Sequence, residues 1–178
     1  MNKGTIIKND NVKTILIIVL VVLCLLLIGA IYYSIHIYQT INTTKNSELN
    51  KTKTTLINDN VMAEINEMYD FHDEKSYHIF KGKNNDGIEQ FVFVSLDDDN
   101  KQIIIDVDDT ISKQQAIDKS TKDCQQCKVV KTNPAMIGNL SLWEIIYYDD
   151  NERYVINYIS MKNGQQIEQL RLVSKYKQ

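Results

Sequence analysis

Residues 141–160, SLWEIIYYDDNERYVINYIS, decide how the C-terminal half of the chain folds. The runs 141–148 and 153–160 are rich in aromatic and β-branched side chains, which favour β-strands. Between them, Asp149 to Glu152 are residues of the kind that favours a turn. The stretch therefore predicts two antiparallel strands joined by a tight turn.

The residues on either side of this hairpin predict a helix followed by a meander. A third strand is expected at 165–173, beyond a turn at 162–164. Upstream, Ser112 and Gln115 have the spacing of a capping box, in which each side chain accepts a backbone N–H at the start of a helix. We therefore expect a helix from Ser112 and, after residues 128–131, three strands.

The preceding part of the chain predicts the same order of elements. From Ile57 onward, apolar residues recur at spacings of four, four, three and one, which is typical of one face of a helix. The residues of this expected face are Val61, Ile65, Met68 and Tyr69. Strands are then expected at 77–81, 90–96 and 102–107. Because helix and meander occur twice, with helix starts about 55 residues apart, the pattern indicates a tandem duplication.

The acidic residues 97–100, Asp-Asp-Asp-Asn, separate two of these strands. Alternating carboxylates can bind Ca²⁺, but Lys101 occupies a ligand position, and no glycine or distal glutamate follows at the EF-hand spacing. We interpret the run as an exposed hairpin turn.

The N-terminal part contains an uncharged apolar run at 15–33, ILIIVLVVLCLLLIGAIYY. As a helix, this run spans roughly 28 Å, which matches the core of a bilayer. Three lysines, Lys3, Lys8 and Lys13, precede the run, whereas the first downstream lysine is Lys45. The positive-inside rule therefore predicts a single-pass protein of the plasma membrane, with its N-terminus in the cytoplasm and its C-terminal domains extracellular.

A cleaved secretory signal is the alternative to a permanent anchor. The run is longer than the h-region of about 7 to 15 residues that such signals contain, and Ile28-Gly29-Ala30 is a poor cleavage site. Cys24 lies inside the run, where we expect a small apolar residue that faces lipid rather than a lipid-attachment site. We therefore expect a signal anchor that is retained.

The chain divides into five expected segments. They are a cytoplasmic tail (1–14), a transmembrane anchor (15–33), a stalk or continued helix (34–55), and two folded regions (56–109 and 110–178). The Thr- and Asn-rich composition of residues 40–60 indicates a stalk, but the absence of glycine and proline also permits a helix that continues from the membrane.

Charge is unevenly distributed over the exterior. Residues 34–109 carry 7 basic and 15 acidic side chains, whereas residues 110–178 carry 10 basic and 7 acidic ones. An exterior that is net acidic argues against the binding of nucleic acid.

The chain contains no recognisable catalytic motif. Its three histidines are His36, His72 and His78, and none lies in the last hundred residues. Nucleophile-elbow, zincin and phosphate-loop patterns are missing as well. For His72, beside Asp73, we expect either a role in capping a helix end or a solvated side chain, with ligand binding as the less favoured alternative. We therefore expect no catalytic residue, no cofactor-binding residue, no metal ligand and no small-molecule substrate, and hence no enzyme.

Cys124 and Cys127 form the most distinctive short motif of the chain, C-Q-Q-C. They fall at the C-terminal end of the expected helix, where the helix dipole opposes a reactive thiolate, so thiol–disulfide catalysis is disfavoured. Zinc would require two further ligands, and no second cysteine or histidine pair is nearby. Two alternatives remain open, a local structural disulfide or two free thiols.

Trp143, the only tryptophan, is expected in the core because it lies in the strongest strand, near Ile145 and Tyr147. Five of the ten tyrosines fall between Tyr147 and Tyr176, and most of them should line the sheet. Exposed ones could form a surface for a partner. Residue chemistry alone names no partner-binding residue.

Two stretches resemble a known family. Residues 140–164, LSLWEIIYYDDNERYVINYISMKNG, resemble the W-E-x-x-Y, x-D-x-x-x-x-Y, Y-x-x-x-x-x-G pattern of the YpmB-like proteins, also called the cell-wall elongation regulator TseB-like family. Residues 77–94, YHIFKGKNNDGIEQFVFV, resemble the membrane-proximal stretch of that family. The similarity extends over essentially the whole chain, including the N-terminal anchor.

The resemblance implies an α+β fold, with an N-terminal transmembrane helix followed by two tandem cystatin-like, PepSY-like domains. Each such domain is a helix packed on a curled antiparallel sheet. The resemblance also implies a non-enzymatic role, in which the exterior binds and regulates a penicillin-binding transpeptidase during cell-wall elongation. The alternative is a PepSY-like inhibitor or sensor that acts on an extracytoplasmic peptidase.

The topology can be tested by adding protease to intact, wall-stripped cells. An epitope at Gln178 should be destroyed and one at Met1 spared, because a single spanning run places the two ends on opposite sides of the membrane. Immunoblots before and after digestion measure both epitopes. Protection of both, or a mature form that lacks the first 30 residues, would contradict a retained anchor with a cytoplasmic N-terminus.

Overall fold

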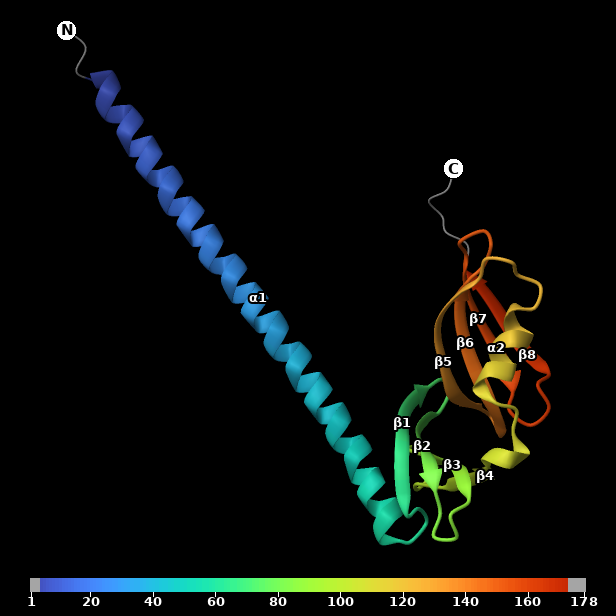
Figure 1. The fold of residues 1–178 in the computed structure, drawn as a ribbon. Coiled ribbons are helices and arrows are strands. Elements are labelled where there is room, and N and C mark those ends of the chain that lie inside the picture. The colour runs from blue at the N-terminus through green and yellow to red at the C-terminus, as the bar shows by residue number, and fades with distance from the viewer. Residues whose placement is uncertain (1–3, 173–178) are drawn as a thin grey trace. The chain divides into compact units, whose positions relative to one another are not determined.

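The computed structural model describes residues 4–172, with the side chains of residues 13–38 and 46–172. It contains a long N-terminal helix and two four-stranded antiparallel sheets, so the predicted α+β class is confirmed (Figure 1). Contacts divide the chain into two compact units, Met1–Glu48 and Leu49–Gln178.

Helix α1, Gly4–Asn58, includes the expected anchor. Within its 26-residue segment Lys13–Tyr38, an 18-residue window has a mean hydropathy of 3.4, and the side chains of the segment are exposed. The segment is long and apolar enough to cross a membrane, which agrees with the run at 15–33. Of the two alternatives for residues 34–55, the structure has the continued helix.

Helix α1 ends where the following residues form a helix-terminating turn. Asn60 has a positive φ of 57°, and its N–H donates to the carbonyl of Ile57. The N–H of Val61 donates to the carbonyl of Leu56. The two bonds together form a Schellman motif, and the apolar cluster that contains Leu56 and Val61 is the contact that usually accompanies it.

The helix expected from Ile57 to Tyr69 is therefore wrong, because residues Glu64–His72 form strand β1. Tyr69 and Phe71, two residues apart, both contact the main apolar core, as the period of a strand requires. Along almost its whole length β1 pairs with β2, which supplies the backbone hydrogen bonds that a helix would have made internally. This long-range pairing outweighs a local apolar spacing that also fits a helix.

The first sheet contains four strands in sequence order, β1, β2 (Ser76–Lys83), β3 (Glu89–Ser95) and β4 (Gln102–Asp106). The last three match the three strands expected in this region. The acidic run forms the β3–β4 turn as expected, with Asp99 and Asn100 at positive φ. One face of the sheet packs against the final turns of α1, through Leu56 and, on the sheet, Phe80, Val92 and Val94.

A short 3₁₀ helix, η1 (Val107–Asp109), leads to helix α2 (Lys113–Thr121), which begins with the predicted capping box of Ser112 and Gln115. The second sheet then contains β5 (Lys128–Ile137), β6 (Leu140–Tyr148), β7 (Tyr154–Ser160) and β8 (Gln166–Leu172), again in sequence order. Strand β5 was not predicted from the sequence, and it includes Pro134. It is an edge strand, where the missing N–H of a proline is tolerated.

Both sheets contribute to one apolar core. Phe71, Ile79 and Phe93 enter it from the first sheet, whereas Ile145 and Val155 enter it from the second. Helix α2 lies across one face of the second sheet and adds Ala116 to the same core (Figure 1). Each sheet thus has a helix of its own, but the two sheets bury their side chains together.

Trp143 lies in this shared core, as predicted, and is only 4% exposed. Its ring packs edge-on against Phe91, with 5.7 Å between the ring centroids. Its Nε1–H donates to the carbonyl of Ile111 at 3.0 Å. One side chain therefore joins strand β6, strand β3 of the other sheet and the residue that precedes the capping box of α2.

Replacing this side chain should destabilise the whole folded unit. We expect Trp143→Ala to lower the free energy of unfolding by about 3 to 5 kcal/mol, because a large buried aromatic group is removed. Denaturant unfolding followed by circular dichroism measures the change. Trp143→Phe, which keeps an aromatic ring and loses the bond to Ile111, should cost less. A Trp143→Ala protein with unchanged stability but lost partner binding would contradict the assignment to the core.

Candidate functional site

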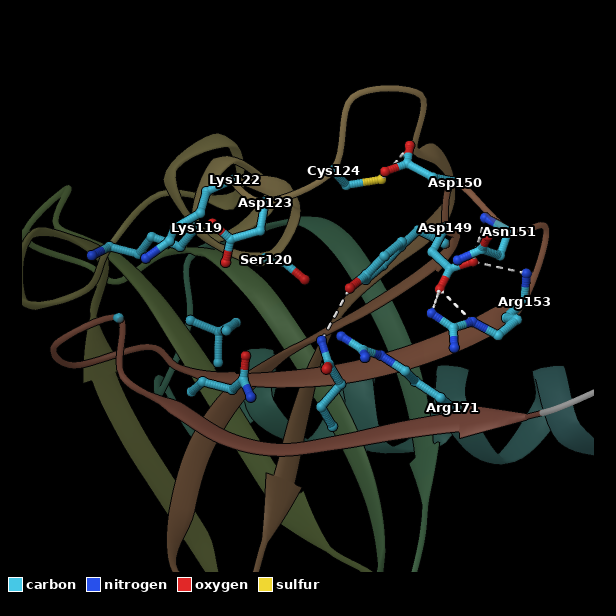
Figure 2. Close-up of a pocket in the computed structure, with 15 residues that line it drawn as sticks. Lys119, Ser120, Lys122, Asp123, Cys124, Asp149, Asp150, Asn151, Arg153 and Arg171 are labelled. Carbon is cyan, nitrogen blue, oxygen red and sulfur yellow. Dashed lines mark hydrogen bonds and ion pairs between the residues drawn. The ribbon is translucent and has the colours of Figure 1, made fainter.

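A polar cavity of about 690 Å³ lies on the α2 side of the second sheet. Its walls are the C-terminal end of α2, the turn between β6 and β7, and strand β8 (Figure 2). Because α2 has only nine residues, it covers part of the sheet and leaves this end accessible. The lining residues therefore come from several separate elements.

Asp149 shapes the turn on one side of the cavity. Its Oδ1 accepts the backbone N–H groups of Asn151 at 2.9 Å and Arg153 at 3.0 Å. Its Oδ2 accepts from Nε of Arg153 at 2.8 Å and lies 2.7 Å from Nη2. The bond from the Arg153 side chain is the main reason that the pKa of Asp149 lies below its usual value, and the same pair raises the pKa of Arg153. The pair thus fixes the shape of the turn and adds no net charge to the cavity.

Cys124 and Cys127 form a disulfide, with their Cα atoms 5.7 Å apart. Asp150 holds the loop between them: its Oδ1 accepts the N–H of Gln126 at 2.7 Å, and its Oδ2 that of Gln125 at 3.3 Å. Asp150 Oδ1 also lies 3.3 Å from the Sγ of Cys124. A carboxylate this close disfavours a thiolate, so the surroundings support a structural disulfide rather than a reactive one.

Asp150 also explains how the two sides of the cavity are connected. It belongs to the β6–β7 turn, whereas the loop that it binds follows α2 (Figure 2). The prediction from sequence included the cysteines but missed Asp150, because the two lie more than twenty residues apart. No local signal relates the motif to this carboxylate.

Hydrogen-bonded polar side chains line the base of the cavity or bond to residues that line it. Asn157 is fully buried and donates from Nδ2 to the Oγ of Ser120 at 2.8 Å. Gln169 donates from Nε2 to the hydroxyl of Tyr147 at 3.1 Å. Burial raises the pKa of Tyr147 and nearby Arg171 opposes that effect, so the hydroxyl is neutral at physiological pH. The one sequence signal for this group is Asn157, which interrupts an inward-facing apolar alternation in β7.

Four cations and three carboxylates, Asp123 among them, line the cavity, so its lining carries one net positive charge. Among the described residues, no ion pair is found for Lys119, Lys122 or Arg171, all of which line the cavity. Figure 2 shows the two lysines on the side opposite Asp149 and Arg153. With the amide groups at the base, these side chains can bind polar or anionic groups. The lining residues include no imidazole, and the hydroxyl of Ser120 already accepts a hydrogen bond, so the arrangement is suited to binding rather than to nucleophilic attack.

The histidines singled out from the sequence lie away from this cavity. His72 is at the end of β1, with Nε2 2.8 Å from Oδ1 of Asp70, and its side chain is 56% exposed. The expected solvated side chain is therefore confirmed, whereas the expected helix cap is wrong because no helix ends there. His78 is buried in β2, and its Nδ1 lies 2.8 Å from the hydroxyl of Thr52 in α1. Over the described residues, no group of three or more His, Cys, Asp or Glu side chains is arranged to hold a metal ion.

Comparison with known proteins gives concordant matches. Residues 51–95 match the family described as the cell wall elongation regulator TseB-like domain. The probable cell wall elongation regulator TseB of Bacillus subtilis (strain 168) is 24% identical over 103 residues, which are 58% of this chain and 64% of the relative. The chain thus matches somewhat less than two thirds of the length of that relative.

A solved structure, the YpmB protein from Bacillus subtilis, has a similar fold. The TM-score is 0.58 at 22% identity, and the match covers 62% of this chain and 87% of that protein. Together with the family match, these findings confirm the resemblance to the YpmB-like, TseB-like proteins.

The Asp149–Arg153 pair makes the turn sensitive to pH. Because the pKa of Asp149 is lower in the folded protein than its usual value of 3.8, the pair stabilises the fold above that pH. The contribution is lost as the pH falls through the lowered pKa. NMR titration of the Asp149 carboxyl carbon should therefore give a midpoint below 3.8.

Two matched variants separate the effect of the Arg153 hydrogen bonds on the pKa of Asp149 from the effect of nearby positive charge in general. Arg153→Gln should move the titration midpoint upward, because the side-chain bond from Arg153 is the largest cause of the lowered pKa. Lys122→Gln also removes a cation from the cavity, but one that does not pair with Asp149, and should leave the midpoint unchanged. Equal shifts in both variants would mean that long-range charge, not the bond, lowers the pKa.

Proposed function

We propose that this chain, which is similar to the TseB-like family of cell wall elongation regulators, is a non-enzymatic, membrane-anchored regulator that binds a penicillin-binding transpeptidase outside the cell. The observation that carries the proposal is the match of residues 51–95 to that family. This segment contains the end of α1 and strands β1 to β3. The name of the Bacillus subtilis relative, a probable cell wall elongation regulator, supports the same role.

The proposed topology places residues 1–14 in the cytoplasm, the anchor at 15–33 in the plasma membrane, and the sheets outside. The lysines before the apolar segment support this orientation. We further propose that 56–109 and 110–178 act as two tandem cystatin-like domains. The repeated order of one helix followed by a four-stranded meander supports this division.

The anchor contributes to regulation by confining the exterior to the membrane where its partner is also held. Two proteins tethered to one surface have a high effective concentration, so a weak contact between their exteriors is sufficient. The apolar segment has no Asp, Glu, Lys, Arg or His between Thr14 and Tyr33 and no G-x-x-x-G pattern, the features that specify helix pairing. The anchor is therefore expected to act as a tether rather than as a recognition element.

Affinity capture from chemically crosslinked membranes tests both parts of this proposal. The full-length chain should co-purify a protein that reacts with fluorescent penicillin, which identifies the partner as a penicillin-binding protein. A chain whose residues 15–33 are replaced by an unrelated transmembrane helix should capture the same protein. The exterior released as a secreted protein at the same level should capture much less of it.

The three chains give distinct failures. If no penicillin-reactive protein is captured by the full-length chain, the proposed partner is wrong. Equal capture by the secreted exterior would mean that tethering is irrelevant. Loss of capture with the exchanged helix, at normal level and topology, would mean that the apolar segment itself makes a specific contact.

A further inference from the structure

The two faces of the second sheet differ in what covers them. In β7, Val155, Asn157 and Ile159 point toward α2 and are buried. The alternate residues Tyr154 and Ile156 point to the opposite side and are half-buried. An antiparallel sheet with one packed face normally carries polar residues on its other face. This sheet instead carries aromatic and aliphatic ones.

Strand register arranges these residues in two adjacent apolar rows. One row crosses β6, β7 and β8 through Tyr148, Tyr154 and Leu172, and the next through Ile146, Ile156 and Leu170. We call the five accessible residues of these rows, Tyr148, Tyr154, Ile156, Leu170 and Leu172, the outer face.

Solvent reaches the outer face. Tyr148 is 41% exposed, Leu170 44% and Leu172 58%. Tyr148 and Tyr154 pack edge-on, with ring centroids 5.6 Å apart, so they form a continuous aromatic surface. Contiguous exposed apolar residues, with tyrosine prominent among them, are typical of surfaces that bind proteins.

Charged residues border the outer face on two sides. The next row along the strands contains Glu144, Tyr158 and Glu168, and the Tyr158 hydroxyl donates to Oε1 of Glu144 at 3.1 Å. On β5, the residues opposite Tyr148 and Ile146 are Lys128 and Lys131. The border is therefore acidic along one side and basic along another.

We propose that the outer face is the docking surface for the partner, and that the partner presents an apolar patch with basic side chains placed to pair with Glu144 and Glu168. This inference rests on the proposed function, and it assigns the contact to β6, β7 and β8 rather than to the polar cavity on the opposite side of the sheet. Charge complementarity at the acidic border sets the orientation of the partner, while burial of the two apolar rows supplies most of the affinity.

A second copy whose strands run parallel or antiparallel to those of the first fits this surface less well. Suppose that the outer faces of two copies lie against each other, related by a two-fold axis that runs along the strands between β6 and β7. Glu144 of one copy would then lie against Tyr158 of the other, and Glu168 against Asn133. An axis across the strands, centred on the Ile146 row, would place Glu144 against Tyr148 and Glu168 against Leu172. Neither arrangement gives the carboxylates a cation. An anionic lipid surface would be repelled by Glu144 and Glu168 and attracted by Lys128 and Lys131, so the border gives it no net attraction.

Site-specific photocrosslinking in cells, with the full-length chain, tests this assignment. The photoreactive residue p-benzoylphenylalanine replaces Tyr148, Leu170, Ile104 or Lys122 in turn. Ile104 is the matched control, because it is also an apolar residue on an edge strand and is 49% exposed. Lys122 reports on the polar cavity. Fluorescent penicillin then shows whether a crosslinked product contains a penicillin-binding protein.

We expect a penicillin-labelled product from positions 148 and 170 and none from 104 or 122. With the crosslinker at 148, Leu170→Glu should reduce that product at least about tenfold, because it places a charge within one of the two apolar rows of the contact. Ile104→Glu should leave it unchanged. Both substitutions replace exposed side chains, and equal protein levels on immunoblots confirm that the variants fold.

The other outcomes separate this inference from the proposed function. A penicillin-labelled product from 104 or 122, but not from 148 or 170, would retain the function and overturn the docking surface. A crosslinked dimer of the chain, or a lipid adduct without protein, from 148 and 170 would overturn it in favour of a second copy or the membrane. Absence of any penicillin-labelled product from all four positions would reject the proposed partner itself, and the docking surface with it.

Discussion

The packing of Trp143 against Phe91 is the contact on which the rest of the folded unit depends. It joins β6 to β3, and the bond from the indole N–H to Ile111 also holds the residue that precedes the capping box of α2. Two four-stranded sheets of this size have little apolar area of their own, and a small separate core provides little stability. Because the sheets share one core, the position of α2, and with it one wall of the polar cavity, depends on an interaction between distant parts of the chain.

The polar cavity is built from fixed groups rather than from reactive ones. Asp149 and Arg153 neutralise each other while they hold the β6–β7 turn, and Asp150 uses its carboxylate to bind the loop closed by the disulfide. Groups that are hydrogen-bonded in this way keep the shape of the surface fixed. They do not provide a nucleophile with an adjacent base, which fits a protein that acts by binding.

The second sheet separates two surfaces of different character. The side that faces α2 is buried in part and polar at its accessible end, whereas the outer face is apolar, accessible and bordered by charge. A regulator tethered beside its target can use a contact of modest area, because confinement to the membrane supplies much of the association free energy. In the proposed docking, the outer face would provide such a contact, on a sheet whose other face is held by the core.

Local signals in the sequence were enough to determine the apolar run at 15–33, six of the eight strands, the turns between them and the capping box at Ser112, since each depends on residues close together in the chain. The family resemblance followed from the order of the same elements. Only the tertiary structure decided that residues 64–72 are a strand, because the backbone hydrogen bonds of β1 are made with β2. The end of α1 likewise depends on the positive φ that Asn60 adopts in the folded chain. Only the tertiary structure likewise brought Asp150 to the cysteine loop and decided which tyrosines are exposed. A one-residue change of register moves every side chain of a strand to the other face, and register is set by pairing with neighbours that the local sequence does not specify.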